Sequence, residues 1–500
     1  KVKVSPDVFS LKRLVEFRSA WMDESATCHA IRNIMAGSGA QSPGTLNIGS
    51  QNLWTGFNEK YPSHSERVMR RGELLLEGIA TIFGWMKVDI GSAPNWRSCF
   101  DEKDSTKEWS DDFYWTIDFS RLKSGPAPDV KINWEINRLQ FLLDLGMCFR
   151  ISGANSYALK ARSFLESWLD SVVYPFGPQW ASNLEVGLRV LSIVRLCQFF
   201  ADSEVWDDEF LLKVMASVEL HLDHLENELT LHHTRGNHLL GEAASLLQVS
   251  LLLSFLKKSK IRIQRASRIL DSVIPDLILS DGVYAEQSVS YAKFVLEFLL
   301  PLCSSESMIN KPLSDSSMTL ILKCLKFLAE ISNNDGMIPM VGDSDSGSAL
   351  GLCLDDYWDF TPLFASGAFM FKDPALLKRV GGFPPESFIV CGKDGLKWHE
   401  SFVNATAARN DGLSMERPMV THFPEGGLIK AEYKSFKLLF DVGPLGKSPG
   451  FEHGHSDGLS AQLWLDDQSA LIDPGTFVYN ANPRWRKYFK GSSAHNVLQF

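Results

Sequence analysis

The sequence has no cysteine pattern typical of a metal site or a disulfide framework, and it has no excess of positive charge. Eight cysteines occur among 500 residues; none forms a C-x-x-C pair, and several stand inside apolar runs, as buried free thiols do. The 50 Lys and Arg against 60 Asp and Glu give a formal net charge of −10, whereas dedicated nucleic-acid binders are usually basic. An anionic ligand would therefore have to be held by local positive charge.

No apolar run is long and uncharged enough to span a membrane. The most apolar stretch, residues 239–256, contains Glu242, Gln248 and three serines, so it is typical of a buried helix. The N-terminal residues also lack the apolar core of a signal peptide. Because such a peptide is removed on export, the compartment stays open. Residues 497–500 read as part of a strand, and we expect the natural chain to continue.

Length and composition fit a globular protein with more than one domain. Hydrophobic residues make up 45% and charged residues 22%, an ordinary balance for a packed protein. At about 150 residues per domain, this length allows roughly three structural units. Apolar residues recur at helical spacing between about residues 65 and 363, and turn clusters separate the helices. The helical patterns cover 134–151, 208–229, 237–256, 262–278, 288–303 and 315–332.

Many helices of similar length joined by short turns indicate a bundle, a solenoid or a ring. Because no strict repeat is present, we favour an irregular α/α ring over a solenoid. Beyond residue 380 the pattern changes to strands, with a hairpin turn at Lys434-Ser435. Helices followed by strands predict two domains: an α/α region over 1–375 that includes an irregular segment 1–64, and an antiparallel β-sandwich over 376–500 that is incomplete at its C-terminal end. The expected strands are 388–391, 428–433, 436–442, 459–465 and 470–473.

An H-x-H pair, His453 and His455, is the clearest candidate for metal binding. In a strand, the period of two would point both imidazoles to one face. Zinc suits such a pair when a carboxylate and a third histidine complete the site, and Asp473 and His495 are candidates on adjacent strands. The alternative is a polar loop whose histidines are satisfied by hydrogen bonds.

The same stretch also matches the G-x-S-x-G nucleophile elbow, with Ser456 at its centre. Asp473 and His495 even follow in the Ser, Asp, His chain order of that fold. The elbow, however, requires a strand before it and a helix after it in a parallel α/β sheet. No βαβ pattern precedes Ser456, and the residues after it alternate like a strand, so the sequence disfavours a serine hydrolase.

Several weaker candidates precede this stretch. Asn237 and His238 begin a helix, where side chains and free backbone N–H groups can bind an anion together, although an N-cap Asn beside a surface His is commoner. Glu286 and Tyr291 follow a turn into another helix, where a Tyr usually packs. The loop 342–347 carries carboxylates that could bind a cation, although such loops are mostly turns.

Together, these motifs and two earlier ones make the sequence resemble the heparinase II/III family of polysaccharide lyases over roughly residues 65–500. The ordered set is far more specific than any one member. It comprises Trp134-Glu-Ile-Asn-Arg138, Trp180 with Glu185 and Arg189, Asn237-His238, Glu286 with Tyr291, Gly342 to Gly347, His453-Gly-His455, Asp473-x-Gly475 and Ala494-His495-Asn496.

The resemblance implies an incomplete α/α toroid followed by an antiparallel β-sandwich, and cleavage of a uronate-containing glycan, heparan sulfate-like first, by β-elimination. It implies that Asn237 neutralises the uronate carboxylate, that Tyr291 is the acid and is also a candidate base, and that His453 is the second proton-transfer group. It also favours a periplasmic or secreted location. The implied substrate-binding residues are His238, Arg235, Glu286, Trp180 and Arg189, and the implied zinc ligands are His455, Asp473 and His495.

The chemistry explains these residue types. The uronate C5 proton is only feebly acidic, so neutralising the carboxylate stabilises the enolate-like transition state, while a base and an acid move the two protons. We expect the pKa of Tyr291 to be lowered by a nearby positive charge, from Arg235 or an imidazolium. We also expect residues 484–490 to supply local positive charge for a polyanionic sugar. Two alternatives stay open: a glycoside hydrolase using paired carboxylates such as Glu286 and Asp343, and a non-catalytic glycan-binding or polysaccharide-assembly protein.

Overall fold

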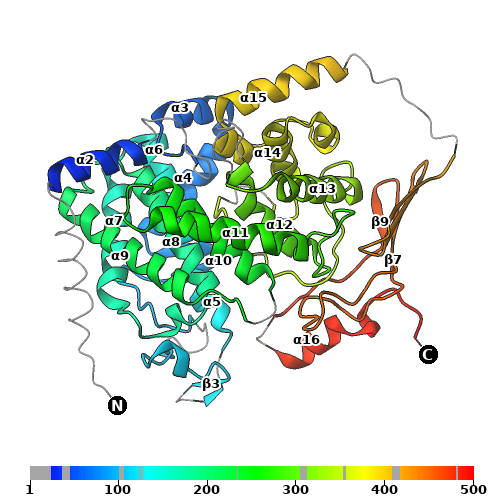
Figure 1. The fold of residues 1–500 in the computed structure, drawn as a ribbon, viewed down its shortest axis with the longest axis horizontal. Helices are drawn as coiled ribbons and strands as arrows, with labels where there is room; N and C mark the ends of the chain where they lie inside the picture. The colour runs from blue at the N-terminus through cyan, green and yellow to red at the C-terminus, as the bar shows by residue number, and fades with distance from the viewer. Residues whose placement is uncertain are drawn as a thin grey trace. The chain divides into compact units, whose positions relative to one another are not determined.

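The computed structural model describes most of the chain, and its elements are labelled in Figure 1. Two compact units are present: Lys1–Leu229 with Gly241–Arg262, and Thr230–Leu240 with Ile263–Phe500. The second unit contains every predicted catalytic and metal-binding residue. The described residues are 24–36, 46–100, 106–122, 125–126, 128–232, 235–303, 312–352, 356–407, 417–479 and 482–499.

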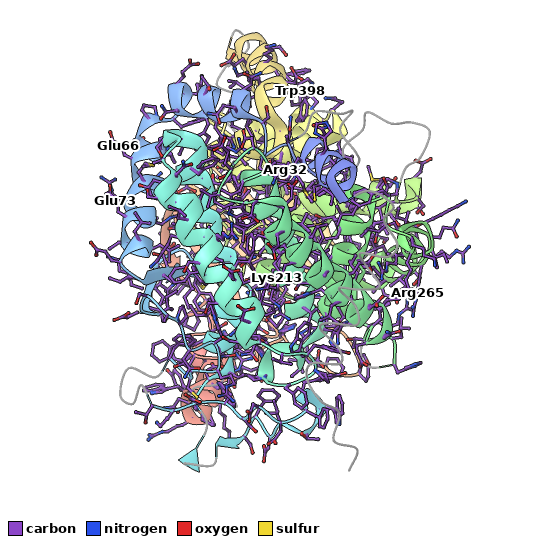
Figure 2. The ribbon with its side chains drawn as sticks, turned by 90° about the vertical axis from the view of Figure 1, so that its left-hand side faces the viewer. Arg32, Glu66, Glu73, Lys213, Arg265 and Trp398 are labelled. Atoms are coloured by element: carbon purple, nitrogen blue, oxygen red, sulfur yellow. The ribbon has the colours of Figure 1, made fainter. Side chains whose placement is uncertain are left out.

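The first unit is mainly helical. Its centre is α8, Asn183–Phe199, in which every residue is buried. An outer helix, α4, instead buries Val68 and Leu75 and turns Glu66 and Glu73 away from the unit, as Figure 2 shows; this is the amphipathic pattern of a surface helix. The other helices are α2 (Glu24–Met35), α3 (Gln51–Lys60), α4 (Pro62–Leu76), α5 (Val130–Asn137), α6 (Leu143–Ser152), α7 (Asn155–Ser171), α9 (Asp208–Asn227) and most of α10 (Asn237–Leu252).

Four short strands form two hairpins in the first unit. β1 (Ile79–Ile82) pairs with β2 (Met86–Asp89), and β3 (Arg121–Leu122) pairs with β4 (Gly125–Pro126). The second unit contains the start of α10 and helices α11 to α15, followed by a sheet and helix α16. Its helices are α11 (Ser259–Leu277, of which residues 263–277 belong here), α12 (Val289–Leu299), α13 (Asp315–Ile331), α14 (Thr361–Phe371), α15 (Pro385–Ala407) and α16 (Pro483–Lys490).

The sheet of the second unit has five antiparallel strands in sequence order, at the orange and red end of the colour bar in Figure 1. Tyr433 pairs with Phe436, so the predicted hairpin turn at Lys434-Ser435 is confirmed. Lys437 ties the sheet to α13 because its ammonium donates to the carbonyls of Ile331 and Ser332 at the end of that helix. The strands are β5 (Met419–Phe423), β6 (Leu428–Tyr433), β7 (Phe436–Asp441), β8 (Ala461–Leu465) and β9 (Gln468–Leu471).

The predicted order, helices and then antiparallel strands, is confirmed. The strand expected at 388–391 is wrong: these residues lie in α15, which starts at Pro385 and buries Phe388 and Ile389. Proline is favoured in the first turn of a helix, and a four-residue apolar run cannot distinguish a buried strand from a helix. Residues 497–499 form no strand, and residue 500 lies outside the described residues.

The segment 1–64, expected to be irregular, is helical over much of its described part because α2, α3 and the start of α4 lie there. The boundary placed at 375 and 376 stays a prediction; the first strand of the five-stranded sheet begins at Met419. Of the eight cysteines, Cys353 lies outside the described residues. The other seven lie in the described part of the chain, and all but Cys391 are buried. No helix in the described ranges is long and apolar enough to cross a membrane.

Candidate active site

The three predicted catalytic side chains meet in the second unit, although the chain separates them by up to 216 residues. Asn237 is the first residue of α10, Tyr291 stands in the first turn of α12, and His453 lies in the loop between β7 and β8. Asn237 Nδ2 is 3.2 Å from His453 Nε2, and the Tyr291 and His453 rings stack with centroids 3.8 Å apart. All three are buried, at 2%, 7% and 8% exposure.

Local backbone structure fixes Tyr291 and His453 relative to each other. Ser288 caps α12 by accepting a hydrogen bond from the Tyr291 N–H at 3.1 Å. The loop at Gly342 packs against both segments: a Cβ there would lie 2.1 Å from the Gln287 carbonyl oxygen and 2.9 Å from the His453 carbonyl oxygen. With φ at +65°, this position requires glycine both for its conformation and for its close approach.

Glu286 holds Asn237. Its carboxylate accepts from the Asn237 backbone N–H at 3.1 Å, from Asn237 Nδ2 at 2.9 Å and from the Tyr284 hydroxyl at 3.0 Å. The amide is thereby oriented, because the oxygen end cannot face the carboxylate. Asn237 Oδ1 is buried and has no hydrogen-bond partner among the described groups, so it is available to a donor from a ligand.

The hydrogen bonds from Asn237 to Asp345 run in one direction. The Tyr291 hydroxyl donates to Asp345 Oδ2 at 3.3 Å, so in its 2.9 Å contact with Tyr479 it accepts from the Tyr479 hydroxyl. Tyr479 oxygen then accepts from His453 Nδ1–H at 3.2 Å. The second Nδ2 hydrogen of Asn237 donates to His453 Nε2. His453 is therefore the neutral Nδ1–H tautomer, with its basic lone pair on Nε2 beside Asn237.

Asp343 is the central charge of the site. Arg486 on α16 donates to both of its oxygens, His455 Nε2 lies 2.8 Å from Oδ1, and His453 Nδ1 lies 3.5 Å from Oδ2. Burial raises the pKa of the Asp343 carboxyl, but the hydrogen bonds to His453, His455 and Arg486 outweigh it and hold the pKa well below its ordinary value. Asp343 is an ionised anchor and cannot serve as a proton donor.

Tyr291 does not have the lowered pKa that the sequence analysis expected. Burial raises the pKa of its hydroxyl well above 10, and the neighbouring Asp345 carboxylate raises it further. Arg235 does not offset this, because its guanidinium bonds Ser272 and pairs with Asp276 on α11. Tyr291 is therefore protonated at rest, which suits it to donate a proton rather than to remove one.

The predicted zinc ligands also meet. One ligand atom each from His455, Asp473 and His495 lies within 4.8 Å of the others, and all three residues are buried. They stand in loops after β7, after β9 and after a short 3₁₀ turn, so the expectation that strands carry them is wrong. The loop between β7 and β8 contains Gly454 and Gly458, and its turns interrupt the alternation that a strand requires.

The atoms at this cluster suit a metal. His455 directs Nε2 to Asp343, which leaves Nδ1 without a hydrogen-bond partner among the described groups. His495 Nδ1 lies 3.0 Å from Asp473 Oδ2, and its Nε2 likewise has no partner in the described part of the chain. A metal-binding histidine typically has its other ring nitrogen held by a carboxylate, as His455 has here.

The predicted substrate-binding residues divide between the two units. Glu286 belongs to the cluster around Asn237, whereas His238 is exposed on the first turn of α10. Trp180 and Arg189 lie in the first unit, where Arg189 is fully buried, donates to His221 Nε2 at 3.0 Å and lies 4.9 Å from the Trp180 ring centroid. Burial lowers the pKa of Arg189 to about 9. Roles in substrate binding for these residues stay predictions.

Sequence reasoning missed Tyr479 and Asp345, and did not assign Arg486 individually. The segment 484–490 stood out by its charge, and it forms most of α16. Arg486 also covers the Tyr479 ring, with its guanidinium carbon 4.6 Å from the centroid. Tyr479 belongs to no motif or periodic pattern in the sequence. Its contact with Arg486 is therefore visible only in the folded structure.

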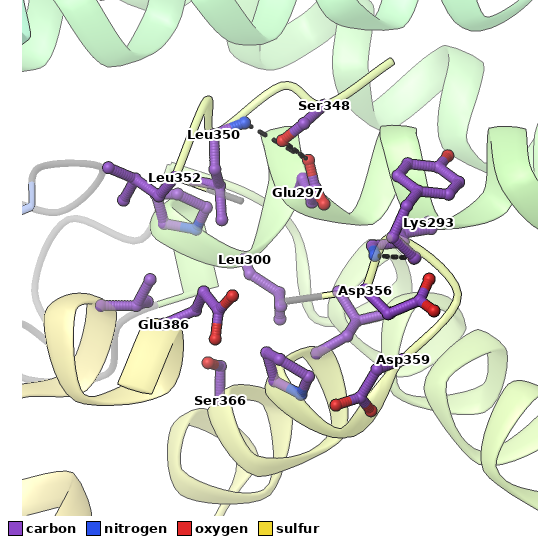
Figure 3. Close-up of a pocket in the computed structure, with 15 residues that line it drawn as sticks. Lys293, Glu297, Leu300, Ser348, Leu350, Leu352, Asp356, Asp359, Ser366 and Glu386 are labelled. Atoms are coloured by element: carbon purple, nitrogen blue, oxygen red, sulfur yellow. Dashed lines mark hydrogen bonds between the residues drawn. The ribbon is translucent and has the colours of Figure 1, made fainter. Parts of the chain in front are cut away.

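A separate hollow lies on the side of α12 that carries Lys293 and Glu297, and Leu300, directly after the end of α12, also lines it (Figure 3). Two of its charged groups are already engaged: Glu297 accepts from the Ser348 hydroxyl and from the Leu350 N–H, and Lys293 donates to the Tyr357 carbonyl. The hollow contains none of the predicted catalytic residues.

Comparisons with known proteins agree with these observations. Heparin-sulfate lyase of Pedobacter heparinus is 22% identical over 389 residues, which cover 75% of this chain and 52% of that protein. Heparin-sulfate lyase of Bacteroides stercoris is 20% identical over 399 residues, which cover 75% and 54%. The chain therefore spans about half the length of these relatives.

Solved structures show the same fold. A mutant of the heparan sulfate lyase HepC from Pedobacter heparinus matches with a TM-score of 0.58 at 18% identity, over 97% of this chain and 69% of that one. A crystal structure of heparinase III matches with a TM-score of 0.56 at 16% identity, over 73% and 54%. These likenesses confirm the predicted fold class, an α/α toroid followed by an antiparallel β-sandwich.

Two family models match the sequence. The model described as heparinase II/III-like, C-terminal, covers residues 415–500. The model of the heparinase II/III N-terminus covers residues 98–367, which is more than half of the chain. The chain belongs to the heparinase II/III family.

Proposed function

We propose that this protein is a polysaccharide lyase that cleaves a heparan sulfate-like, uronate-containing glycan by β-elimination. The observation that carries the proposal is the meeting of Asn237, Tyr291 and His453, with every hydrogen oriented by Glu286 and Asp345. The lyase names of the relatives support the same reaction class.

In this proposal, each side chain has one role. Asn237 binds the uronate carboxylate with the Nδ2 hydrogen that donates to His453 Nε2 in the free site, and it stabilises the charge that develops as C5 loses its proton, an effect of roughly 3–4 kcal/mol for a good donor. The lone pair of His453 Nε2, released from Asn237 when the substrate binds, removes that proton. Tyr291, protonated at rest, gives its proton to the departing glycosidic oxygen. Each proton transfer contributes about 10²–10⁴-fold.

The alternative glycoside hydrolase fits the site less well. A hydrolase requires one carboxyl group with a raised pKa to protonate the leaving oxygen. Asp343 has a lowered pKa and is bound by Arg486 and His455. Glu286 accepts three hydrogen bonds from Asn237 and Tyr284. Both carboxylates are therefore committed to orienting other side chains.

The exposed face of α16 supplies positive charge for an acidic chain despite the net charge of −10. Arg484 and Lys487 are exposed there, beside the ring of Trp485, which is 47% exposed. Arginine and lysine side chains bind carboxylates and other anions.

An assay against a panel of uronate polysaccharides, with and without sulfate, tests the proposed function. We expect new ultraviolet absorbance from unsaturated uronate ends, strongest with heparan sulfate-like chains. Binding without any absorbance change would instead support the non-catalytic alternative. New reducing ends without absorbance would support a hydrolase.

We further propose that His455, Asp473 and His495 hold zinc, whose contribution is to tie three loops of the second unit together. Purified protein is expected to contain about one zinc per chain by elemental analysis, with ligand distances of roughly 2.0–2.2 Å. A chelator should lower the melting temperature, because binding to the folded state stabilises it. A His495→Ala variant that keeps the wild-type zinc content would contradict this assignment; a His422→Ala variant serves as a control.

A further inference from the structure

The hydroxyl of Tyr479 lies between the proposed acid and the proposed base. It is 2.9 Å from the Tyr291 hydroxyl and 3.2 Å from His453 Nδ1. Because Tyr291 donates its only hydrogen to Asp345, Tyr479 must donate to Tyr291 and accept from His453. One hydroxyl therefore contacts both groups that move protons.

The fold holds Tyr479 firmly in this position. The Arg486 guanidinium lies over its ring at 4.6 Å and is itself anchored by both oxygens of Asp343. Earlier in the same segment, the Thr476 hydroxyl accepts from the Ser344 N–H at 2.7 Å, which joins this segment to the loop that carries Asp345. The donor in Tyr479 is thus preorganised rather than recruited during the reaction.

This position matters for the half of the reaction in which the glycosidic bond breaks. As the C4–O bond breaks, the hydroxyl proton of Tyr291 passes to the glycosidic oxygen, and Tyr291 is left as a phenolate beside the Asp345 carboxylate. That ionisation is costly in a buried site next to a negative charge. A fixed O–H donor aimed at the phenolate oxygen stabilises it without rearrangement.

We propose that Tyr479 is a positioning residue that makes Tyr291 an effective acid, by donating to the Tyr291 oxygen as it loses its proton. The proposal rests on the proposed lyase function and adds a residue to it. Tyr479 exchanges no proton in the step. Its acceptor side also fixes His453 as the Nδ1–H tautomer, although Asp343 Oδ2, at 3.5 Å from Nδ1, provides a second acceptor. The acid half of the reaction therefore depends on Tyr479 more than the base half does.

The test compares Tyr479→Phe with wild type on two substrates: a heparan sulfate oligosaccharide and a uronate that carries a nitrophenoxide at C4, which leaves without a proton. We expect kcat on the oligosaccharide to fall by about 10- to 100-fold, the effect of losing one hydrogen bond to a charged group, with KM within about twofold. On the nitrophenoxide, the variant should keep at least about half of the wild-type rate. The solvent deuterium isotope effect on kcat for the oligosaccharide should rise, because proton donation becomes slower.

Tyr357→Phe is the matched control, since Tyr357 is also a buried tyrosine whose hydroxyl bonds a residue of α12, Ser290 at 2.7 Å. Equal losses on both substrates with an unchanged isotope effect would make the role of Tyr479 purely structural and overturn the proposal. So would a wild-type rate on the oligosaccharide. Wild-type protein that produces no unsaturated uronate from either substrate would instead refute the lyase function itself.

Discussion

Replacing Tyr291 by Phe is expected to lower the rate of elimination by at least about 10²-fold, the low end for loss of an acid–base group. The substitution removes one hydroxyl and leaves the ring that stacks on His453 at 3.8 Å, so the protein should still fold. Substrate affinity should change little because Asn237 still binds the carboxylate. A loss in kcat at constant KM marks a group that acts in the transition state.

Steady-state kinetics on a heparan sulfate oligosaccharide measure this effect, with Tyr357→Phe as the control for loss of a buried tyrosine hydroxyl. Near-normal turnover by a well-folded Tyr291→Phe variant would remove Tyr291 from the mechanism. His453 would then be the one proton-transfer group left from the predicted set.

Replacing Asp343 by Asn should be the most damaging single change to stability in the site. Asp343 is fully buried, and it neutralises Arg486 while holding His455. Removing one partner of a buried ion pair leaves the other charge uncompensated, which costs about 3–5 kcal/mol. Because Arg486 keeps some contact with water at 18% side-chain exposure, we expect a loss near the lower end, about 3 kcal/mol.

The midpoint of urea unfolding measures this loss. Asp356→Asn is the matched control, because Asp356 is exposed and its carboxylate accepts one backbone hydrogen bond, from Trp358; it should change the free energy of unfolding by less than about 0.5 kcal/mol. An Asp343→Asn variant as stable as wild type would show that Arg486 and His455 do not depend on this carboxylate.

The fold class and the main site residues were both predictable from the sequence, but from different kinds of evidence. Helices such as α13 and α9 have apolar residues at the 3.6-residue period over about five turns. This period can be read within a single segment of the sequence, so it predicts the helix without any knowledge of distant contacts. Asn237, Tyr291 and His453 have no such signal. They were found because the ordered motifs resemble a family, and the structure then brought their side chains together.

What sequence reasoning could not predict depends on contacts between distant segments. Tyr479 is 188 residues from Tyr291, and Arg486 is 143 residues from Asp343. Neither pair leaves a pattern along the chain. The expected lowering of the Tyr291 pKa failed for the same reason, because the burial and the Asp345 carboxylate that raise it are properties of the folded site. The histidine pair was placed in a strand because alternation over three residues cannot distinguish a strand from a loop.

The central claim is that the bond is broken by elimination, and the fate of water tests it most directly. A purified oligosaccharide of heparan sulfate should be cleaved in water labelled with heavy oxygen, and both products weighed by mass spectrometry. Elimination adds no water, so the account predicts product masses that sum to the mass of the substrate, with no label in either product. Product masses that sum to the substrate plus one water, with the label incorporated, would contradict it and establish hydrolysis.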